Sequence, residues 1–470
     1  MEKIFGKTNV TDAPHNLLAY SYDATEADPS FPDFVVLPEN VEQVVAVVRL
    51  ASEERFPLVP YITGNNIGGL TIPEHGGVLL DFGKKMNRVL LVHESHMYAL
   101  LEPGVTFGQL NRYLLDHHPS LRYSYPFAPP HSRVVGNAIL SGMNNMSSVH
   151  GSMGDWINGL EVVTHDGSVV RVGSCFSTRE FSPNNWHSRY PMPDLLGLFV
   201  NWEGMTGIVT KCAVQLWPRK PIETALLAVT TDVASTADLM RQVARLELVD
   251  DVSTVSIEVA KMALGLPEPP KHEQEPPFAH IFPISAHDHA HLRAKLDVIG
   301  RTVDALNEKH GPRIQVVDVD VMISLVGERL RCFYDLPNVI LPLVEYSGLT
   351  WVGTYAPPDE LEALIEEANA LFAKFGVPAF VYMKMMKGGH YAIFRPIIRF
   401  RRERELERTR ALLEALLESA LEHGCIPYKT PTWMTAKLRE RIDPNWVALF
   451  ERVKHFMDPR GIFNPGRWNT

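Results

Sequence analysis

The stretch DFVVLPENVEQVVAVVRLASEERFPLVPYITGNN, residues 33–66, decides the expected fold, because it contains two strands and a helix in one continuous pattern. Residues 34–37 form a short apolar run that a Pro-Glu pair interrupts. Valines then recur at helical spacing as far as Ala51, and residues 58–62 form a second apolar run. This order predicts a βαβ unit, in which a helix joins two strands of one sheet.

The second strand of this unit runs into a loop rich in glycine and asparagine, TGNNIGG, residues 63–69. Glycine lets a backbone approach a ligand closely, and successive N–H groups can form a concave anion-binding nest. The loop matches neither GxGxxG nor the Walker A sequence, so the usual NAD and ATP signatures are absent. A tight loop without a ligand is the alternative. We predict a pyrophosphate site formed by Gly64, Asn65, Asn66, Gly68 and Gly69.

Composition narrows the class of protein. The 470 residues are 45% hydrophobic and 21% charged, which is typical of soluble globular proteins with two or three cores at this length. The net charge of -10 argues against nucleic acid as a partner, because phosphate binding needs a basic face. Four scattered cysteines without a CxxC pair suggest a reducing compartment. With no run near the roughly 20 apolar residues of a membrane helix, we expect a cytoplasmic protein without an integral membrane segment.

The pattern of expected strands and helices changes along the chain and divides it into three parts. Their mixture of strands and helices predicts an α+β fold. Residues 1–221 continue with strands and amphipathic helices, including a helix expected near Thr106 and a hairpin that turns at Asp166-Gly167. Residues 222–427 alternate strand-like runs with long charged helices. Residues 428–470 contain a last helix and a tail rich in proline and glycine. We place the domain limits at these changes.

Glycine-rich turns recur at the ends of the expected strands. They stand in LEPGVTFGQLN (101–111), VVGNAILSGM (134–143), HGSMGDWINGL (150–160) and GMTGIVTKCAVQLWP (204–218). With loop 63–69 and VKHFMDPRGIFNPGRW (453–468), these segments resemble, in order, the FAD-linked oxidases of the vanillyl-alcohol oxidase and p-cresol methylhydroxylase (PCMH) type. The wider group includes glycolate and D-lactate dehydrogenases. The resemblance implies a PCMH-type FAD-binding domain of two subdomains, an α+β substrate cap over the flavin ring, and a C-terminal return to the first domain.

The resemblance also implies which residues hold FAD. The loop from Thr63 to Gly69, including Ile67, would wrap the pyrophosphate. Arg467 would place positive charge near the flavin, where it would stabilise the negative charge left on the ring by hydride transfer. The alternative for Arg467 is a cation on a surface tail. The later turns would line the rest of the cofactor through Pro103, Gly104, Gly136, Asn137, His150, Gly151, Gly207, Ile208 and Val209.

The segment GCIPYKTPTWM, residues 424–434, resembles the Tyr-Arg-Thr sequence with which the phenol-oxidising enzymes bind and ionise their substrate. Tyr428 and Lys429 stand in the first two positions. A phenol ionises at about pH 10, so a tyrosine hydroxyl and a nearby cation favour the phenolate, which pushes a hydride from its para side chain to the flavin. Lysine supplies the charge but not the bidentate fork of arginine. The alternative is an exposed lysine after a strand.

The segment KGGHYAIFRPIIRF, residues 387–400, adds His390 and Arg395 as candidate catalytic residues. Strand alternation places them on opposite faces, so we do not expect both to face the flavin unless a bulge intervenes. His390 stands where the phenol-oxidising enzymes carry histidines, and a structural histidine is the alternative. The hydroxy-acid enzymes begin a metal-binding His-x6-His here. Its second histidine would fall at Ile397, so we expect no metal site.

Three departures from the phenol-oxidising pattern concern the flavin. Ile67 replaces a tyrosine that contacts the phenolate, and the aspartate beside the flavin ring falls at Ser152, with Asp155 nearby. No histidine stands where relatives tether FAD covalently. We therefore expect non-covalent FAD, with Tyr355 as the alternative for a tyrosyl link.

Together these features predict a FAD-dependent oxidoreductase that takes a hydride from a para-substituted phenol or a related alcohol. The electrons would pass to O2 or to an electron-acceptor protein. One alternative is a D-2-hydroxy-acid dehydrogenase, in which Arg395 or Lys429 would pair with the substrate carboxylate. Another is a flavin-binding subunit of a complex with no chemistry of its own. Relatives are often dimers, so the resemblance also implies a homodimer.

Overall fold

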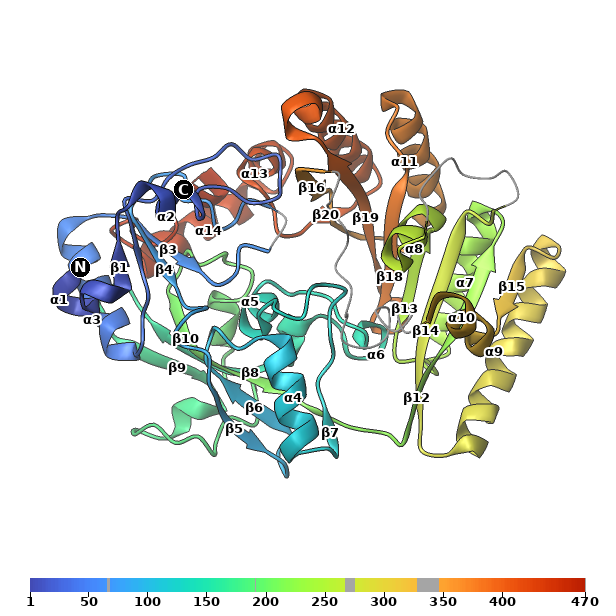
Figure 1. Cartoon of the computed structure of the whole chain (residues 1–470), viewed down its shortest axis with the longest axis horizontal. Coiled ribbons are helices and arrows are strands. Elements are labelled where there is room, and N and C mark those ends of the chain that lie inside the picture. Colours follow the sequence, from blue (N-terminus) through green and yellow to red (C-terminus); the bar gives the residue numbers. More distant parts are fainter. Residues whose placement is uncertain (66–67, 191, 267–274, 328–345, 470) are drawn as a thin grey trace.

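The computed structural model describes residues 1–65, 68–190, 192–266, 275–327 and 346–469. Two halves lie side by side, and both chain termini are in the same half (Figure 1). The middle of the chain forms the other half around its own large sheet. Within the described ranges, no helix combines the length and the apolar character that crossing a bilayer requires.

The predicted βαβ unit is confirmed, with one further strand inserted between its two strands. The four-stranded sheet has the order β1-β2-β4-β3, in which β2 and β3 both run parallel to β4. Asn40 caps the connecting helix, and Val44, Val47 and Val48 are buried in a core shared with the sheet. The bounds are β1 (Val10–Thr11), β2 (Phe34–Val36), β3 (Leu58–Tyr61), β4 (Val78–Asp81) and α3 (Val41–Glu54), with α1 (Glu2–Phe5) and α2 (Pro14–Leu18) before them.

An antiparallel five-stranded sheet, β5-β6-β10-β8-β9, completes this half. The predicted hairpin is its β8–β9 pair, and Gly167 takes the left-handed φ of +77° that the turn requires. The predicted helix also begins where expected, because Thr106 and Gln109 form a capping box. The bounds are β5 (Val89–His93), β6 (Tyr98–Leu101), α4 (Phe107–His117), α5 (Val134–Ile139), α6 (Ser147–His150), β8 (Ile157–Val163), β9 (Val169–Gly173) and β10 (Ile208–Gln215).

A nine-stranded sheet forms the second half, in the order β15-β12-β14-β13-β18-β19-β17-β20, with β16 paired to β19. One face packs against α7, α9, α11 and α12, and the other packs against α8 and side chains of the first half. Its strands are β12 (Ile222–Thr230), β13 (Val252–Ser256), β14 (Phe278–Ala286), β15 (Ile314–Val317), β16 (Gly348–Trp351), β17 (Thr354–Ala356), β18 (Phe380–Met386), β19 (Tyr391–Phe400) and β20 (Ile426–Pro427). Its helices are α7 (Val233–Arg245), α8 (Ile257–Leu264), α9 (His289–His310), α10 (Val319–Val326), α11 (Leu361–Phe375) and α12 (Arg402–Glu422).

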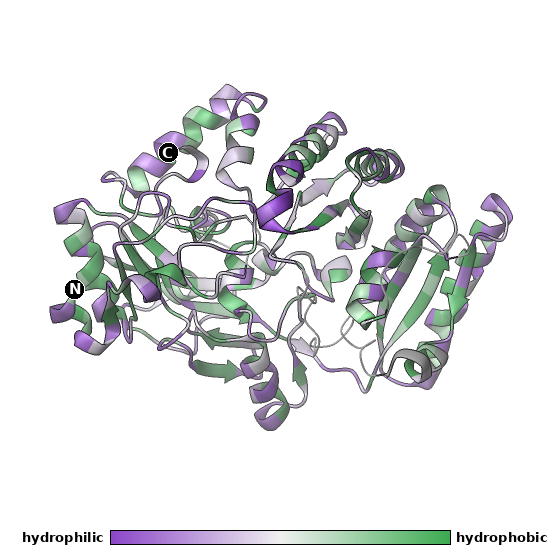
Figure 2. Cartoon of the chain, turned by 45° about the horizontal axis from the view of Figure 1, so that its top comes forward, coloured by the Kyte–Doolittle hydropathy of each residue, from purple (hydrophilic) through white to green (hydrophobic). Residues whose placement is uncertain are grey.

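The end of the chain returns to the first half through α13 (Thr432–Arg439) and α14 (Pro444–Met457). Leu58 of β3 donates its N–H to the Ile462 carbonyl at 2.7 Å, and Asn464 donates back to the Leu58 carbonyl at 2.9 Å. The strands of both halves are hydrophobic and the outer faces of the helices are hydrophilic (Figure 2). The sheet strands of the second half all lie within residues 222–427, and the exact domain limits stay a prediction.

Candidate active site

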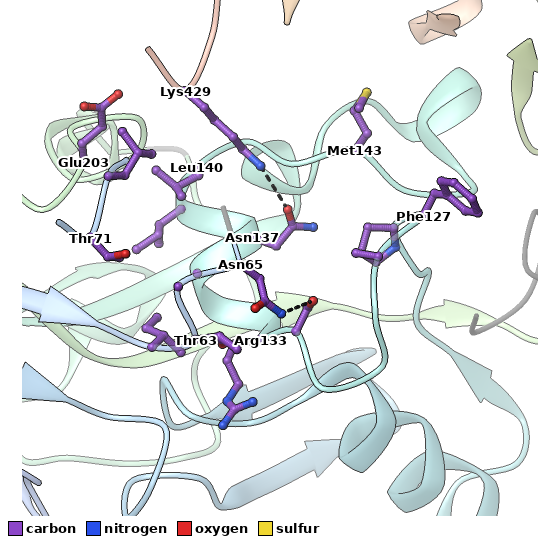
Figure 3. A pocket seen from close by; sticks show the side chains of 18 of the residues that line it. Thr63, Asn65, Thr71, Phe127, Arg133, Asn137, Leu140, Met143, Glu203 and Lys429 are labelled. Atoms are coloured by element: carbon purple, nitrogen blue, oxygen red, sulfur yellow. Dashed lines mark hydrogen bonds between the residues drawn. The ribbon is translucent and has the colours of Figure 1, made fainter. Parts of the chain in front are cut away.

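A cavity lies between the two halves, and both contribute to its walls. Its volume is about 220 Å³, and it is partly open to solvent. The first half provides the end of β3 with its loop, α5 and the segment 126–133. The second half provides side chains of β16, β18 and β19, and Lys429 enters from the returning segment. Figure 3 shows side chains that line this cavity and labels ten of them.

The predicted pyrophosphate loop forms one wall. Thr63, Gly64 and Asn65 line the cavity, and Asn65 Nδ2 donates to Ser132 Oγ at 3.3 Å (Figure 3). Gly64 has a φ of +66°, and a Cβ there would lie 2.6 Å from the Tyr61 hydroxyl oxygen. A residue with a side chain would therefore be strained at this position. The predicted positions Asn66 and Ile67 lie outside the described residues.

The rest of the loop is held by packing against the C-terminal segment. A Cβ on Gly68 would lie 2.7 Å from the Lys429 carbonyl oxygen, and Gly69 has a φ of +64°. Arg467 donates to the Gly69 carbonyl at 2.6 Å and to the Ile72 carbonyl at 3.0 Å. Only 1% of Arg467 is exposed, so the alternative of a surface cation is wrong. These hydrogen bonds from the Arg467 guanidinium hold the end of the loop in place.

The short helix α5 forms the wall beside the loop. Gly136 and Asn137 line the cavity as predicted, and a Cβ on Gly136 would lie 3.1 Å from Ile62. Lys429 Nζ points at Asn137 and donates to its Oδ1 at 3.5 Å (Figure 3). The helix thus links the predicted cofactor-binding residues to the predicted catalytic segment.

The remaining predicted FAD residues lie outside the cavity lining. Gly104 is buried in a turn, where its N–H donates to the Met86 carbonyl at 2.7 Å. His150 stacks on Trp217 with ring centroids 3.7 Å apart, and burial lowers its pKa to about 4. The cavity lining does not include Pro103, Gly104, His150, Gly151, Gly207, Ile208 or Val209, and their contact with FAD stays a prediction.

The fold brings Tyr428, Lys429 and Arg395 together. Arg395 donates to the Tyr428 hydroxyl, and its guanidinium carbon lies 4.4 Å from the centre of the Trp351 ring and 5.4 Å from that of Tyr382. Burial raises the pKa of Tyr428, and the positive charge of Arg395 opposes that shift. Arg395 and Lys429 line the cavity, and Tyr428 adjoins it through its hydrogen bond with Arg395.

Lys429 is half-buried and lines the cavity, so the alternative of an exposed lysine is wrong. Burial disfavours its charged form, and the nearby Arg395 charge acts in the same direction; together they lower the pKa of Lys429 to about 7. An amine with this pKa exchanges a proton readily near neutral pH.

His390 does not join this group. It is exposed in the turn between β18 and β19, whereas Arg395 lies within β19 and lines the cavity. His390 precedes β19, so the turn and not strand alternation separates the two residues, and this placement gives no support to a catalytic role for His390. Across the ranges that the structure describes, no group of three or more His, Cys, Asp or Glu side chains is arranged to hold a metal ion.

The sequence interpretation missed Lys384 of β18. This lysine is 1% exposed, forms an ion pair with Asp251 and donates to the Asn144 carbonyl at 2.7 Å. Burial alone would lower the pKa of Lys384, but the charges of Asp251 and Tyr382 and the hydrogen bonds to them together outweigh that effect and raise it. A single lysine in the otherwise apolar run FVYMKMM, residues 380–386, was the available signal.

Glu203 was also missed. Like Thr71 it lines the cavity (Figure 3), and it has a φ of +51°. Burial raises the pKa of Glu203 to about 7, against the opposing charge of Arg467 and a hydrogen bond from Thr430 at 3.5 Å. A glutamate between the glycine-rich turn and a tryptophan, NWEGMTG (201–207), was the signal.

The residues around the cavity fit a polar dinucleotide. In the part of the chain that the structure describes, buried polar atoms that line a cavity and have no protein partner call for a ligand or water. The active-site cavity has five such atoms: Thr63 Oγ1, Arg133 Nε, Asn144 Nδ2, Glu203 Oε2 and Arg395 Nε. Most are donors, which suits the acceptor oxygens and nitrogens of FAD.

Two family matches cover most of the chain. Residues 32–173 match the family described as FAD binding domain. Residues 223–468, more than half of the chain, match the family described as FAD linked oxidases, C-terminal domain. The cavity lies between these two matched regions.

Two relatives match this chain over almost its full length. The glycolate oxidase subunit GlcD of Bacillus subtilis is 27% identical over 99% of this chain and 95% of its own length. A probable mitochondrial D-lactate dehydrogenase of Danio rerio is 30% identical over 93% of this chain and 84% of its own length. A solved structure of p-cresol methylhydroxylase with bound substrate superimposes with a TM-score of 0.85 at 21% identity, covering 99% of this chain and 95% of that one. The chain therefore has the fold of p-cresol methylhydroxylase. It belongs to the FAD-linked oxidases, and it is a FAD-dependent oxidoreductase.

Proposed function

We propose that this enzyme removes a hydride from the para side chain of a phenol or from a related alcohol. The observation that carries the proposal is that Arg395 and Lys429 both line the cavity and that Arg395 donates to the Tyr428 hydroxyl beside it. FAD supplies the acceptor for the hydride when it is bound. The protein's own groups would bind the phenol oxygen and move its proton.

The walls around this polar end suit an aromatic ring. Phe127, Met143, Trp351 and Tyr382 line the cavity. Aromatic and thioether side chains pack favourably against a ring through its faces and edges. A phenol could thus place its ring among these side chains while its oxygen reaches the polar group.

The polar end favours a negative charge on that oxygen. Among the described residues, neither Arg395 nor Lys429 forms an ion pair with a carboxylate. Because the pKa of Lys429 is about 7, its neutral amine can accept the phenol proton. The resulting ammonium, the Arg395 guanidinium and the Tyr428 hydroxyl would then stabilise the phenolate.

A D-2-hydroxy acid is the second candidate substrate. The guanidinium of Arg395 can pair with a substrate carboxylate as well as with a phenolate. Two relatives across nearly the whole chain carry the names glycolate oxidase subunit and probable D-lactate dehydrogenase. The same cavity would then orient the hydroxyl-bearing carbon by its carboxylate.

Anaerobic reduction of the FAD-loaded enzyme separates these functions. Addition of 4-ethylphenol should bleach the flavin, while D-lactate and glycolate should leave it oxidised. Bleaching only by the hydroxy acids would favour the second candidate. Failure of every donor would favour a flavin-binding subunit of a complex. Readmission of O2 then shows whether O2 or an acceptor protein takes the electrons.

We also propose that FAD is held without a covalent bond. Acid precipitation should release the yellow colour into the supernatant. Colour that stays with the precipitate would indicate a covalent link. Tyr355, which stacks on Tyr428 with ring centroids 5.2 Å apart, is the candidate for it.

A further inference from the structure

A second cavity lies where the first half meets the large sheet. It occupies about 160 Å³ and is lined by residues 122–125 and Arg219 of the first half, and by residues of β12 and β14 with Asp250 of the second. One segment separates it from the active-site cavity. Met143 and Asn144 line the active-site cavity, and the next two residues line the second one.

Unsatisfied polar atoms gather around this cavity. Within the described ranges, five of its lining residues carry a buried polar atom that has no hydrogen-bond partner in the protein: Arg122 Nε, Tyr123 Oη, Ser124 Oγ, Asn145 Nδ2 and Arg219 Nε. Tyr123 is 1% exposed and Ser124 is 3% exposed, so bulk solvent does not satisfy them. Buried polar groups are costly without partners. The same feature marks the active-site cavity, whose lining fits FAD.

These atoms would be satisfied by a ligand that accepts hydrogen bonds. The three nitrogen atoms can only donate, and the two hydroxyls can donate as well. A single water needs roughly 10–15 Å³, so a cavity of about 160 Å³ has room for a polyatomic ligand. A compact group with several acceptor oxygens would satisfy most of the donors at once.

The surrounding charge is compatible with an anion. Arg122 pairs with Glu223 at 3.1 Å and with Asp250 at 3.3 Å, and Arg219 pairs with Glu223 at 2.9 Å. Two cations thus balance two carboxylates in the lining. Lys295 adds positive charge behind the sheet, where its Nζ donates to the Ser285 carbonyl at 3.0 Å.

We propose that the second cavity binds a small oxyanion, either an inorganic oxyanion or a short carboxylate. The ion would accept hydrogen bonds from the donors of the first half beside the strands of the second half. It would therefore hold the two halves together and stabilise the folded enzyme by mass action. This site is separate from the FAD and substrate positions and does not depend on the proposed substrate.

Calorimetric titration of the FAD-loaded enzyme tests the proposal, first with inorganic phosphate and then with acetate to distinguish the two sources. Bound FAD occupies the predicted pyrophosphate site, so that site does not compete with the second cavity for the added phosphate. We expect one binding site for at least one of the two anions. Tyr123→Phe removes a single unsatisfied hydroxyl and keeps the ring. Arg219→Gln removes the guanidinium N–H donors of Arg219. Each should weaken binding about tenfold.

Two variants act as controls. Arg241→Gln removes an arginine of similar exposure, also ion-paired along the chain, far from the cavity lining. Arg395→Gln removes one cation of the active-site cavity. Both should bind the anion as the wild type does. The proposal fails if neither anion binds, if Tyr123→Phe and Arg219→Gln bind it unchanged, or if Arg395→Gln abolishes binding. A crystal structure grown in phosphate that shows only ordered water in the cavity would also overturn it.

Discussion

At the scale of single residues, the charge of Lys429 controls the proposed proton transfer. Its pKa is lowered to about 7, so the neutral base is present above that pH and is lost as the pH falls below it. We expect the rate of flavin reduction by 4-ethylphenol to rise with pH through about 7 and then level off. Stopped-flow absorbance under anaerobic conditions measures this rate.

Arginine at the same position gives the matched comparison. Because arginine stays protonated, Lys429→Arg should lose the pH dependence and slow flavin reduction about a hundredfold. Lys437→Arg, on α13 and outside the cavity lining, should keep the wild-type profile. A wild-type pH profile in Lys429→Arg would assign the titration to another group.

Glu203 gives a prediction about stability. Its pKa is raised from the ordinary value to about 7, so folding favours the protonated form and the ionised form destabilises the protein as the pH rises. Glu203→Gln removes that ionisation. Its Tm should exceed the wild-type Tm at pH 8, and the difference should shrink as the pH falls to 5. Glu422→Gln, on the exposed end of α12, is the control and should show no such trend.

At the scale of elements, the loop after β3 depends on its left-handed glycines. Gly64→Ala places a Cβ at a φ of +66° and 2.6 Å from the Tyr61 hydroxyl oxygen, and the backbone strain alone is about 1–2 kcal/mol. We expect its FAD affinity to fall about tenfold, measured by fluorescence titration of the apoprotein. Gly300→Ala, in helix α9 with nothing within 4 Å, should bind FAD normally. Equal affinities would remove the loop from the FAD site.

Strand β18 depends on a buried ion pair. Lys384→Met leaves Asp251 as an unpaired buried carboxylate beside β13, which should destabilise the protein by about 3 kcal/mol. Replacing both residues with apolar ones, as in Lys384→Met with Asp251→Leu, should recover much of the loss. Thermal unfolding followed by circular dichroism compares the two variants. A double variant no more stable than the single one would show that the pair is not the cause.

Local patterns were sufficient to predict several elements. Helical spacing of valines gave α3, the Asp166-Gly167 turn gave the β8–β9 hairpin, and Thr106 marked the start of α4. Each depends on residues close together in the chain. The insertion of β4 between β2 and β3 could not be predicted in this way, because strand order is set by contacts between distant segments.

At the scale of the whole molecule, the site combines segments that lie far apart in sequence. The sequence predicted the loop at Gly64, the helix residue Asn137 and the pair Tyr428 and Lys429, all of which line or adjoin the cavity. These residues stand in short recognisable motifs. The sequence did not predict the hydrogen bond that Arg395 donates to the Tyr428 hydroxyl.

The missed residues show the limit of reading motifs. Lys384 and Glu203 belong to no motif that names a role. Lys384 reaches the cavity from the large sheet, and Glu203 reaches it from a turn of the first half that contacts the returning segment. Trp351 likewise contributes through the pairing of β16 with β19. The second cavity has the same origin, since its walls come from both halves.

The central claim is that the Tyr428, Lys429 and Arg395 group binds a phenol oxygen in the cavity between the two halves. A crystal structure of the FAD-loaded enzyme with bound phenol, which has no para side chain to oxidise, tests it most directly. The account predicts the phenol oxygen within hydrogen-bond distance of the Tyr428 hydroxyl and of at least one of the two cations. Phenol bound elsewhere, or with its oxygen turned away from all three groups, would contradict it.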